Sequence, residues 1–122
     1  MSKLLYVGLL DKSDQKFTGV LKKSYSIQTA FKNAGYDTAF LHLNGELTIE
    51  LESADEGTTT FQIPESVTDS RLMKNHNRKK EILSILAEDV IEQYKPNIVI
   101  LRFVLADQSL IRTFKKLKHY GI

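Results

Sequence analysis

Two short segments, Leu4–Gly8 (LLYVG) and Gly19–Lys23 (GVLKK), decide the fold predicted for this chain. The first is apolar on both faces, which is typical of a central strand in a parallel sheet. A polar loop over 9–18 separates it from the second segment, which begins a helix. A buried strand followed by a crossover helix predicts an α/β fold.

The start of this helix is the first candidate site. Ligands of open α/β sheets bind outside the carboxyl ends of the strands, and helix N-termini favour anions. Gly19 lets a ligand approach the backbone, and Lys22 and Lys23 add positive charge. These residues predict a site for a phosphate, pyrophosphate or sugar. Alternatively, Gly19 only begins the helix and the lysines are solvated, because neither phosphate-binding glycine fingerprint is present.

An antiparallel hairpin follows the first helix. Its predicted strands cover 38–43 and 46–52, with Asn44-Gly45 as a two-residue turn. Such a turn pairs Leu43 with Glu46. The second strand alternates apolar and acidic residues, so one of its faces is wet and the hairpin lies near a sheet edge.

The second half of the chain adds helices and another buried strand. Helical patterns cover 72–94 and the segment from Ala106 or Asp107 onward, and Ile98–Leu101 is the parallel strand between them. The predicted fold is a Rossmann-like three-layer sandwich with a mostly parallel sheet. Because no strand follows the last helix, we expect a truncated domain, although that helix could instead cover a sheet edge.

Composition narrows the class of protein. The 122 residues suffice for one domain, and 42% hydrophobic and 26% charged residues are ordinary for a globular chain. No cysteine is present, which excludes disulfides and thiolate metal sites and suits a reducing cytoplasm. The three histidines lack metal-ligand spacing, so they predict no metal site; they are His42, His76 and His119.

Charge is unevenly spread although the net charge is only +2. Segment 44–70 has seven acidic residues and no lysine or arginine, whereas 71–80 has five basic residues. Such basic patches can touch anionic lipid or nucleic acid, or they are simply solvated helix faces. Basic and aromatic residues are not interleaved, so the sequence does not predict nucleic-acid binding.

Four segments together resemble the start of a GT-B glycosyltransferase of the bacterial, retaining, nucleotide-sugar-dependent class; they are Lys3–Gly8, Gly19–Lys23, Phe31–Tyr36 and Lys95–Arg102. The resemblance implies that 1–122 is the N-terminal, acceptor-side Rossmann-like domain and that the C-terminal donor-binding domain is absent. The complete enzyme would transfer a sugar from a nucleotide sugar to a glycan or lipid-linked acceptor in capsule and surface polysaccharide biosynthesis. It would need no cofactor and no metal, because the nucleotide sugar is its substrate. It would act in the cytoplasm, in peripheral contact with the inner face of the membrane. The fragment alone would be inactive.

The resemblance also implies where substrates bind. It places Gly19 and Lys22 at the cleft between the two domains. Relatives often carry a histidine where this chain has Arg102, which could bind an acceptor phosphate, stabilise charge or form a salt bridge at the strand end. The competing hypothesis is a stand-alone α/β signalling or interaction module of receiver size, although only one acid, Asp11, follows the first strand.

Overall fold

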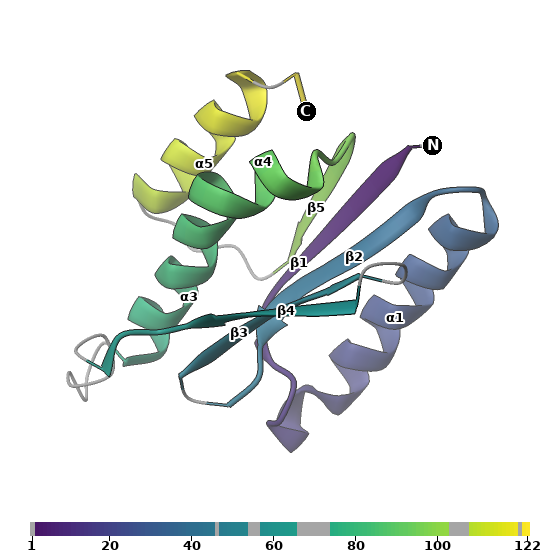
Figure 1. Ribbon diagram of the computed structural model, residues 1–122. Coiled ribbons are helices and arrows are strands. Elements are labelled where there is room, and N and C mark those ends of the chain that lie inside the picture. The colour runs from purple at the N-terminus through teal and green to yellow at the C-terminus, as the bar shows by residue number, and fades with distance from the viewer. Residues whose placement is uncertain (1, 46, 54–56, 66–73, 103–107, 120) are drawn as a thin grey trace.

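The computed structural model describes the chain except residues 1, 46, 54–56, 66–73, 103–107 and 120, and the side chains of 17, 74–76 and 108–110 (Figure 1). Its elements form a five-stranded sheet in the order β4-β3-β2-β1-β5 with helices on both faces. In chain order the elements are β1 (Lys3–Asp11), the 3₁₀ turn η1 (Gln15–Phe17), α1 (Thr18–Asn33), β2 (Asp37–Leu43), β3 (Thr48–Ser53), β4 (Gly57–Gln62), α3 (Lys74–Ile85), the π-helical turn η2 (Leu86–Val90), α4 (Ile91–Tyr94), β5 (Ile98–Arg102) and α5 (Gln108–His119).

The sheet is mixed rather than mostly parallel. β1 pairs in parallel with β2 and with β5, whereas β2–β3 and β3–β4 are antiparallel. The predicted α/β class is confirmed at this level, and the antiparallel strands do form one edge. The parallel share was overestimated because β4 extends the hairpin by a full strand.

β1 is the centre of the fold and is longer than predicted. It is buried from Leu4 to Leu10 and ends at Asp11, rather than at Gly8. Between Val7 and Asp11 its pairing with β2 is irregular, so β1 bulges there. The apolar side chains of this extension pack into the core, and Asp11 lies at its carboxyl end.

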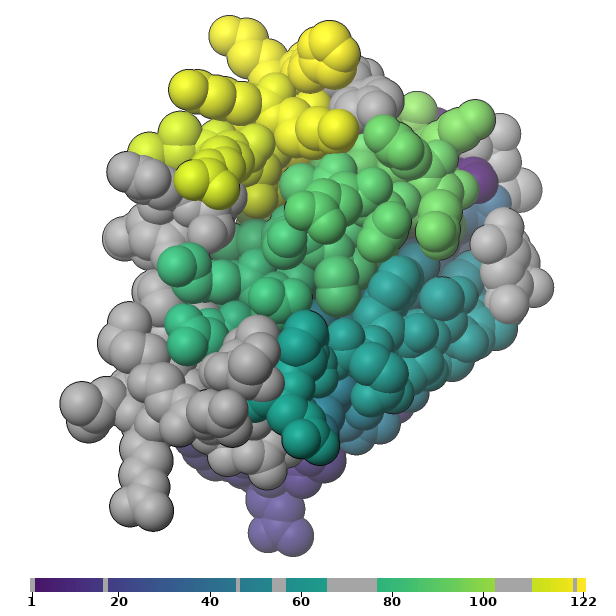
Figure 2. All heavy atoms as spheres, turned by 60° about the vertical axis from the view of Figure 1, so that its left-hand side comes forward, coloured from purple at the N-terminus to yellow at the C-terminus, as the bar shows by residue number. Residues whose placement is uncertain are grey.

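Helices cover the two faces unequally (Figures 1 and 2). On one face lies α1. Its Leu21 and Tyr25 pack against Tyr6 and Phe40. On the other face lie α3, η2, α4 and α5. They contribute buried side chains to a larger core; these include Ile82, Leu86, Ile91 and Leu117. Within the described residues, no helix is both long and apolar enough to cross a membrane.

The end of α1 follows its sequence signal. Gly35 has a φ of +95°, a conformation that favours glycine, and the Tyr36 N–H donates to the Phe31 carbonyl at 3.0 Å. The predicted glycine end of this helix is therefore confirmed. The chain then turns directly into β2, which begins at Asp37.

The hairpin register differs from the two-residue-turn prediction by three residues. Leu43 pairs with Ile49 rather than with Glu46, and the Asn44 N–H donates to the Thr48 carbonyl across a longer loop. A shift by an odd number exchanges the two faces of a strand. The observed register buries Leu41, Leu43, Ile49 and Leu51 in one core. Their shared burial outweighs the preference of Asn-Gly for a tight turn.

Replacing Ile49 with alanine tests this register. Ile49 is fully buried on the face of the sheet that packs against α3. Ile49→Ala should therefore lower the free energy of unfolding by about 2–5 kcal/mol. Thr60→Ala, on the exposed strand β4, is the control and should change it by less than about 0.5 kcal/mol. Urea unfolding measures both. Equal effects of the two substitutions would contradict the observed register.

Candidate functional site

The carboxyl ends of the three parallel strands lie along the same edge of the sheet, which runs across the strands. β1 ends at Asp11, β2 at Leu43 and β5 at Arg102. Polar side chains gather beside the first two ends on both faces of the sheet. One group contacts α3, and the other contacts α1. This edge is therefore the candidate functional region, because ligands of α/β sheets bind beyond the carboxyl ends of parallel strands.

Asp11 joins three elements on the α3 side. Its Oδ1 accepts hydrogen bonds from the backbone N–H (2.9 Å) and hydroxyl (2.7 Å) of Ser13 and from the Gly45 N–H (2.9 Å). Its Oδ2 lies 3.0 Å from Nη2 of Arg78, which also donates to the Gly45 carbonyl. Burial alone would raise the pKa of Asp11, but these hydrogen bonds outweigh it and the pKa is lowered.

A cavity of about 110 Å³ lies beside this ion pair. Its charged lining consists of three cations and two carboxylates, which gives a formal charge of +1. Arg78 is almost completely buried, and Lys79 is half-buried. The residues that line the cavity are Leu9, Leu10, Asp11, Asp14, Lys16, Leu43, Arg78 and Lys79. The lining of the cavity therefore combines apolar residues from the strand ends with charged residues whose net charge is positive.

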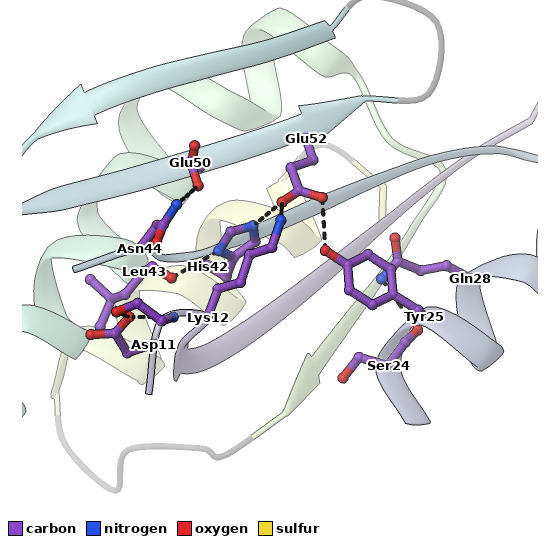
Figure 3. Close-up of polar contacts among 11 residues, drawn as sticks. Asp11, Lys12, Ser24, Tyr25, Gln28, His42, Leu43, Asn44, Glu50 and Glu52 are labelled. Atoms are coloured by element: carbon purple, nitrogen blue, oxygen red, sulfur yellow. Dashed lines mark hydrogen bonds and ion pairs between the residues drawn. The ribbon is translucent and has the colours of Figure 1, made fainter. Parts of the chain in front are cut away.

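The α1 side holds a cluster of His42, Glu50 and Glu52, called here the His–Glu cluster (Figure 3). His42 is fully buried on β2, directly opposite Glu50 on β3. Its Nδ1 lies 2.9 Å from the carbonyl oxygen of Leu43, and its Nε2 lies 2.8 Å from Oε1 of Glu52. Asn44 Nδ2 donates to Glu50 Oε1 at 2.6 Å. A backbone carbonyl and side-chain hydrogen bonds thus hold the cluster in place.

Glu52 has two further partners. Lys12 Nζ donates to its Oε1 at 2.6 Å, and the Tyr25 hydroxyl donates to its Oε2 at 2.9 Å (Figure 3). Burial raises the pKa of Glu52, but hydrogen bonds from Lys12, Tyr25 and His42 outweigh it, so the pKa is lowered. The hydrogen bond to Glu52 raises the pKa of Lys12. Glu52 is therefore held as a carboxylate.

The residues predicted from the sequence lie outside both groups. Gly19, Lys22 and Lys23 are exposed on α1, and a Cβ on Gly19 would meet nothing within 4 Å. Arg102 is half-buried at the end of β5, where it pairs with Gly8 of β1. None of the four is among the residues that line the cavity beside Asp11. Their roles in ligand binding stay predictions.

Sequence reasoning missed the residues that the structure brings together. Asp11 was placed in a loop, although the apolar run that reaches Leu10 could have carried β1 to it. The predicted two-residue turn, which pairs Leu43 with Glu46, places His42 opposite Leu47. The proximity of His42 to Glu50 and Glu52 therefore depends on the observed register. Arg78 carried no signal beyond its place in a basic segment.

Comparisons with known proteins give little support to any family. No family model and no curated protein matches the chain. Among solved structures, a clostripain from Bacteroides thetaiotaomicron ATCC 29148, in complex with a peptide inhibitor, is similar with a TM-score of 0.49. The two are 7% identical, and the match covers 88% of this chain and 98% of the clostripain chain. A likeness this distant carries no argument about function.

The glycosyltransferase identification is not borne out and is withdrawn, together with sugar transfer and capsule biosynthesis. No family model and no curated protein supports it, and the similar solved structure is a clostripain. The segments that suggested the family are strand and helix boundaries, such as the glycine end of α1. Many α/β proteins use such boundaries for folding alone.

Acid stability tests the polar network around Glu52. Its pKa is lowered in the folded chain, so the unfolded chain binds a proton more readily, and stability rises with pH. This contribution is complete above the ordinary carboxyl range and is lost as pH falls from roughly 5 toward 3. Glu52→Gln should flatten the free energy of unfolding in that window, whereas Glu88→Gln, an exposed control on η2, should not. Unchanged acid sensitivity in Glu52→Gln would refute the network.

Proposed function

We propose that this chain is a small-molecule-binding α/β domain, which holds a phosphate or carboxylate group of its ligand in the cavity beside Asp11. The observation that supports this most is the net positive charge of a cavity at the carboxyl edge of the parallel strands. Arg78 at its wall offers a guanidinium, which suits planar or tetrahedral oxyanions.

The size of the cavity limits the group that it takes. Sites for whole drug-sized ligands have volumes of roughly 300–1,000 Å³. A volume of about 110 Å³ suits one anionic group. The remainder of the ligand would lie over the edge of the sheet, where β1 and β2 end.

The two carboxylates of the cavity reduce its attraction for anions but leave the net charge of its lining at +1. Asp11 already accepts hydrogen bonds from Ser13, Gly45 and Arg78. Asp14 accepts one from the Lys16 N–H at the start of η1 and lies 3.7 Å from Lys16 Nζ. That ion pair is exposed and therefore weak, so the ammonium of Lys16 can turn to an incoming anion at little cost.

Several expectations from the sequence stay predictions within this proposal. A nucleotide sugar is one member of the proposed ligand class, as is a glycan or lipid acceptor that carries a phosphate. Binding at Gly19, Lys22, Lys23 and Arg102, a Rossmann-like arrangement, peripheral membrane contact and a cytoplasmic location likewise remain predictions. Sugar transfer is not part of the proposal.

Two pairs of substitutions with equal charge distinguish the cavity from the start of α1. Lys16→Gln with Lys79→Gln removes two cations of the cavity and leaves the Asp11–Arg78 ion pair intact. It should weaken the binding of inorganic pyrophosphate roughly 5- to 30-fold, if each lysine contributes about 0.5–1 kcal/mol. Lys22→Gln with Lys23→Gln is the matched control and should leave binding unchanged. Calorimetry and amide chemical shifts measure both.

The reverse pattern would favour the site predicted from the sequence over the cavity. Equal weakening by both pairs would indicate that pyrophosphate responds only to total charge, and it would refute a specific site. Amide shifts that do not include Asp11, Lys16 or Lys79 in the wild-type protein would also contradict the proposal. Thermal unfolding of each variant verifies that the fold is retained.

A further inference from the structure

We propose that His42, Glu50 and Glu52 form a zinc-binding site on the α1 side of the sheet. One ligand atom from each residue lies within 4.8 Å of the others. The cluster lies on β2 and β3, whereas the anion cavity lies on the α3 side of the β1 end. The inference therefore goes beyond the proposed function and does not rest on it.

The hydrogen bonds of His42 point to a cation at Nε2. Its Nδ1 faces the Leu43 carbonyl and its Nε2 faces the Glu52 carboxylate, and both of these groups only accept hydrogen bonds. A neutral imidazole has one N–H and leaves one of these contacts without a proton. Either a second proton or a metal ion at Nε2 resolves the conflict, while Nδ1–H donates to the backbone as in many metal-bound histidines.

Every member of the cluster is held by an outer partner, as the ligands of metal sites are. The Leu43 carbonyl fixes the ring of His42. Asn44 Nδ2 donates to Glu50, and the Tyr25 hydroxyl donates to Glu52 Oε2. These contacts orient the three side chains toward one another before any ion arrives (Figure 3).

Charge balance supports a divalent ion. Two carboxylates, Glu50 and Glu52, lie two residues apart on the same face of β3, and Lys12 supplies an ammonium at 2.6 Å from Glu52 Oε1. The single ammonium of Lys12 balances only one of the two carboxylates, Glu50 and Glu52. A Zn²⁺ ion carries two positive charges and balances both. Its arrival would displace the ammonium of Lys12 from Glu52, and the Lys12 side chain, which is 37% exposed, can turn to the solvent.

A zinc ion would require the ligand atoms to rearrange. Tetrahedral zinc with bonds of about 2.0–2.1 Å holds neighbouring ligand atoms about 3.3 Å apart. His42 Nε2 and Glu52 Oε1 are 2.8 Å apart, so their separation would have to increase by about 0.5 Å. The Glu52 side chain is 23% exposed and is therefore not enclosed on every side. One imidazole and two carboxylates suit zinc, and they leave a fourth position for water.

Zinc titration of the full chain tests the site, with a chromogenic chelator as competitor. We expect one ion per chain. His42→Asn and Glu50→Gln should each weaken binding at least tenfold, whereas Lys12→Met should tighten it because the competing ammonium is gone. His119→Asn, at the exposed end of α5, is the matched control and should bind zinc as the wild type does.

Two measurements keep the test decisive. Because His42 is buried, circular dichroism must show that His42→Asn is folded; if it is not, Glu50→Gln decides, since its amide oxygen can still accept from Asn44. Calorimetry in buffers of different ionisation enthalpy should show proton release on zinc binding. Wild-type affinity in Glu50→Gln, weaker binding in Lys12→Met, or a loss caused by His119→Asn would overturn the proposal.

Discussion

The apolar face that β2 and β3 share is the constraint on which the candidate sites depend. Leu41, Leu43, Ile49 and Leu51 all enter the same core, and this fixes which residues of the hairpin lie opposite one another. Each such side chain stabilises the fold by about 1.5–3 kcal/mol when buried, more than a turn preference supplies. The same register also fixes which residues lie together on the opposite face of the hairpin. The His–Glu cluster is thus a consequence of hydrophobic register on the reverse side.

The contacts of Asp11 are the second feature on which the structure depends. Its carboxylate contacts the loop after β1, the hairpin loop at Gly45 and Arg78 of α3, so three segments far apart in the sequence meet at one side chain. The ion pair is mostly buried, with side-chain exposures of 16% for Asp11 and 9% for Arg78. Removing one partner of such a pair leaves a charge that water reaches poorly. The same ion pair forms part of the wall of the neighbouring cavity.

The sequence predicted those parts of the fold that depend on local chemistry. The buried first strand and the glycine end of α1 at Gly35 follow from an apolar run and a backbone preference. The parallel strand predicted over 98–101 is also present as β5, but it is a half-buried edge strand rather than a buried one. The candidate sites depend on distant pairings that local patterns do not contain. The register of β3 against β2 and the contact of Arg78 with Asp11, 67 residues away, are decided by packing. A resemblance carried by strand and helix boundaries could not reveal them.

Both candidate sites already contain their own counter-ions, and this determines how a ligand would be selected. In the His–Glu cluster, Lys12 occupies the place beside Glu52 that a metal would take. In the cavity, Asp11 already neutralises Arg78. A ligand therefore competes with an intramolecular ion pair, and its affinity is the difference between two sets of contacts. Strongly charged ligands with several donor or acceptor atoms gain most from this exchange, since a single ammonium or carboxylate only replaces the interaction that it breaks.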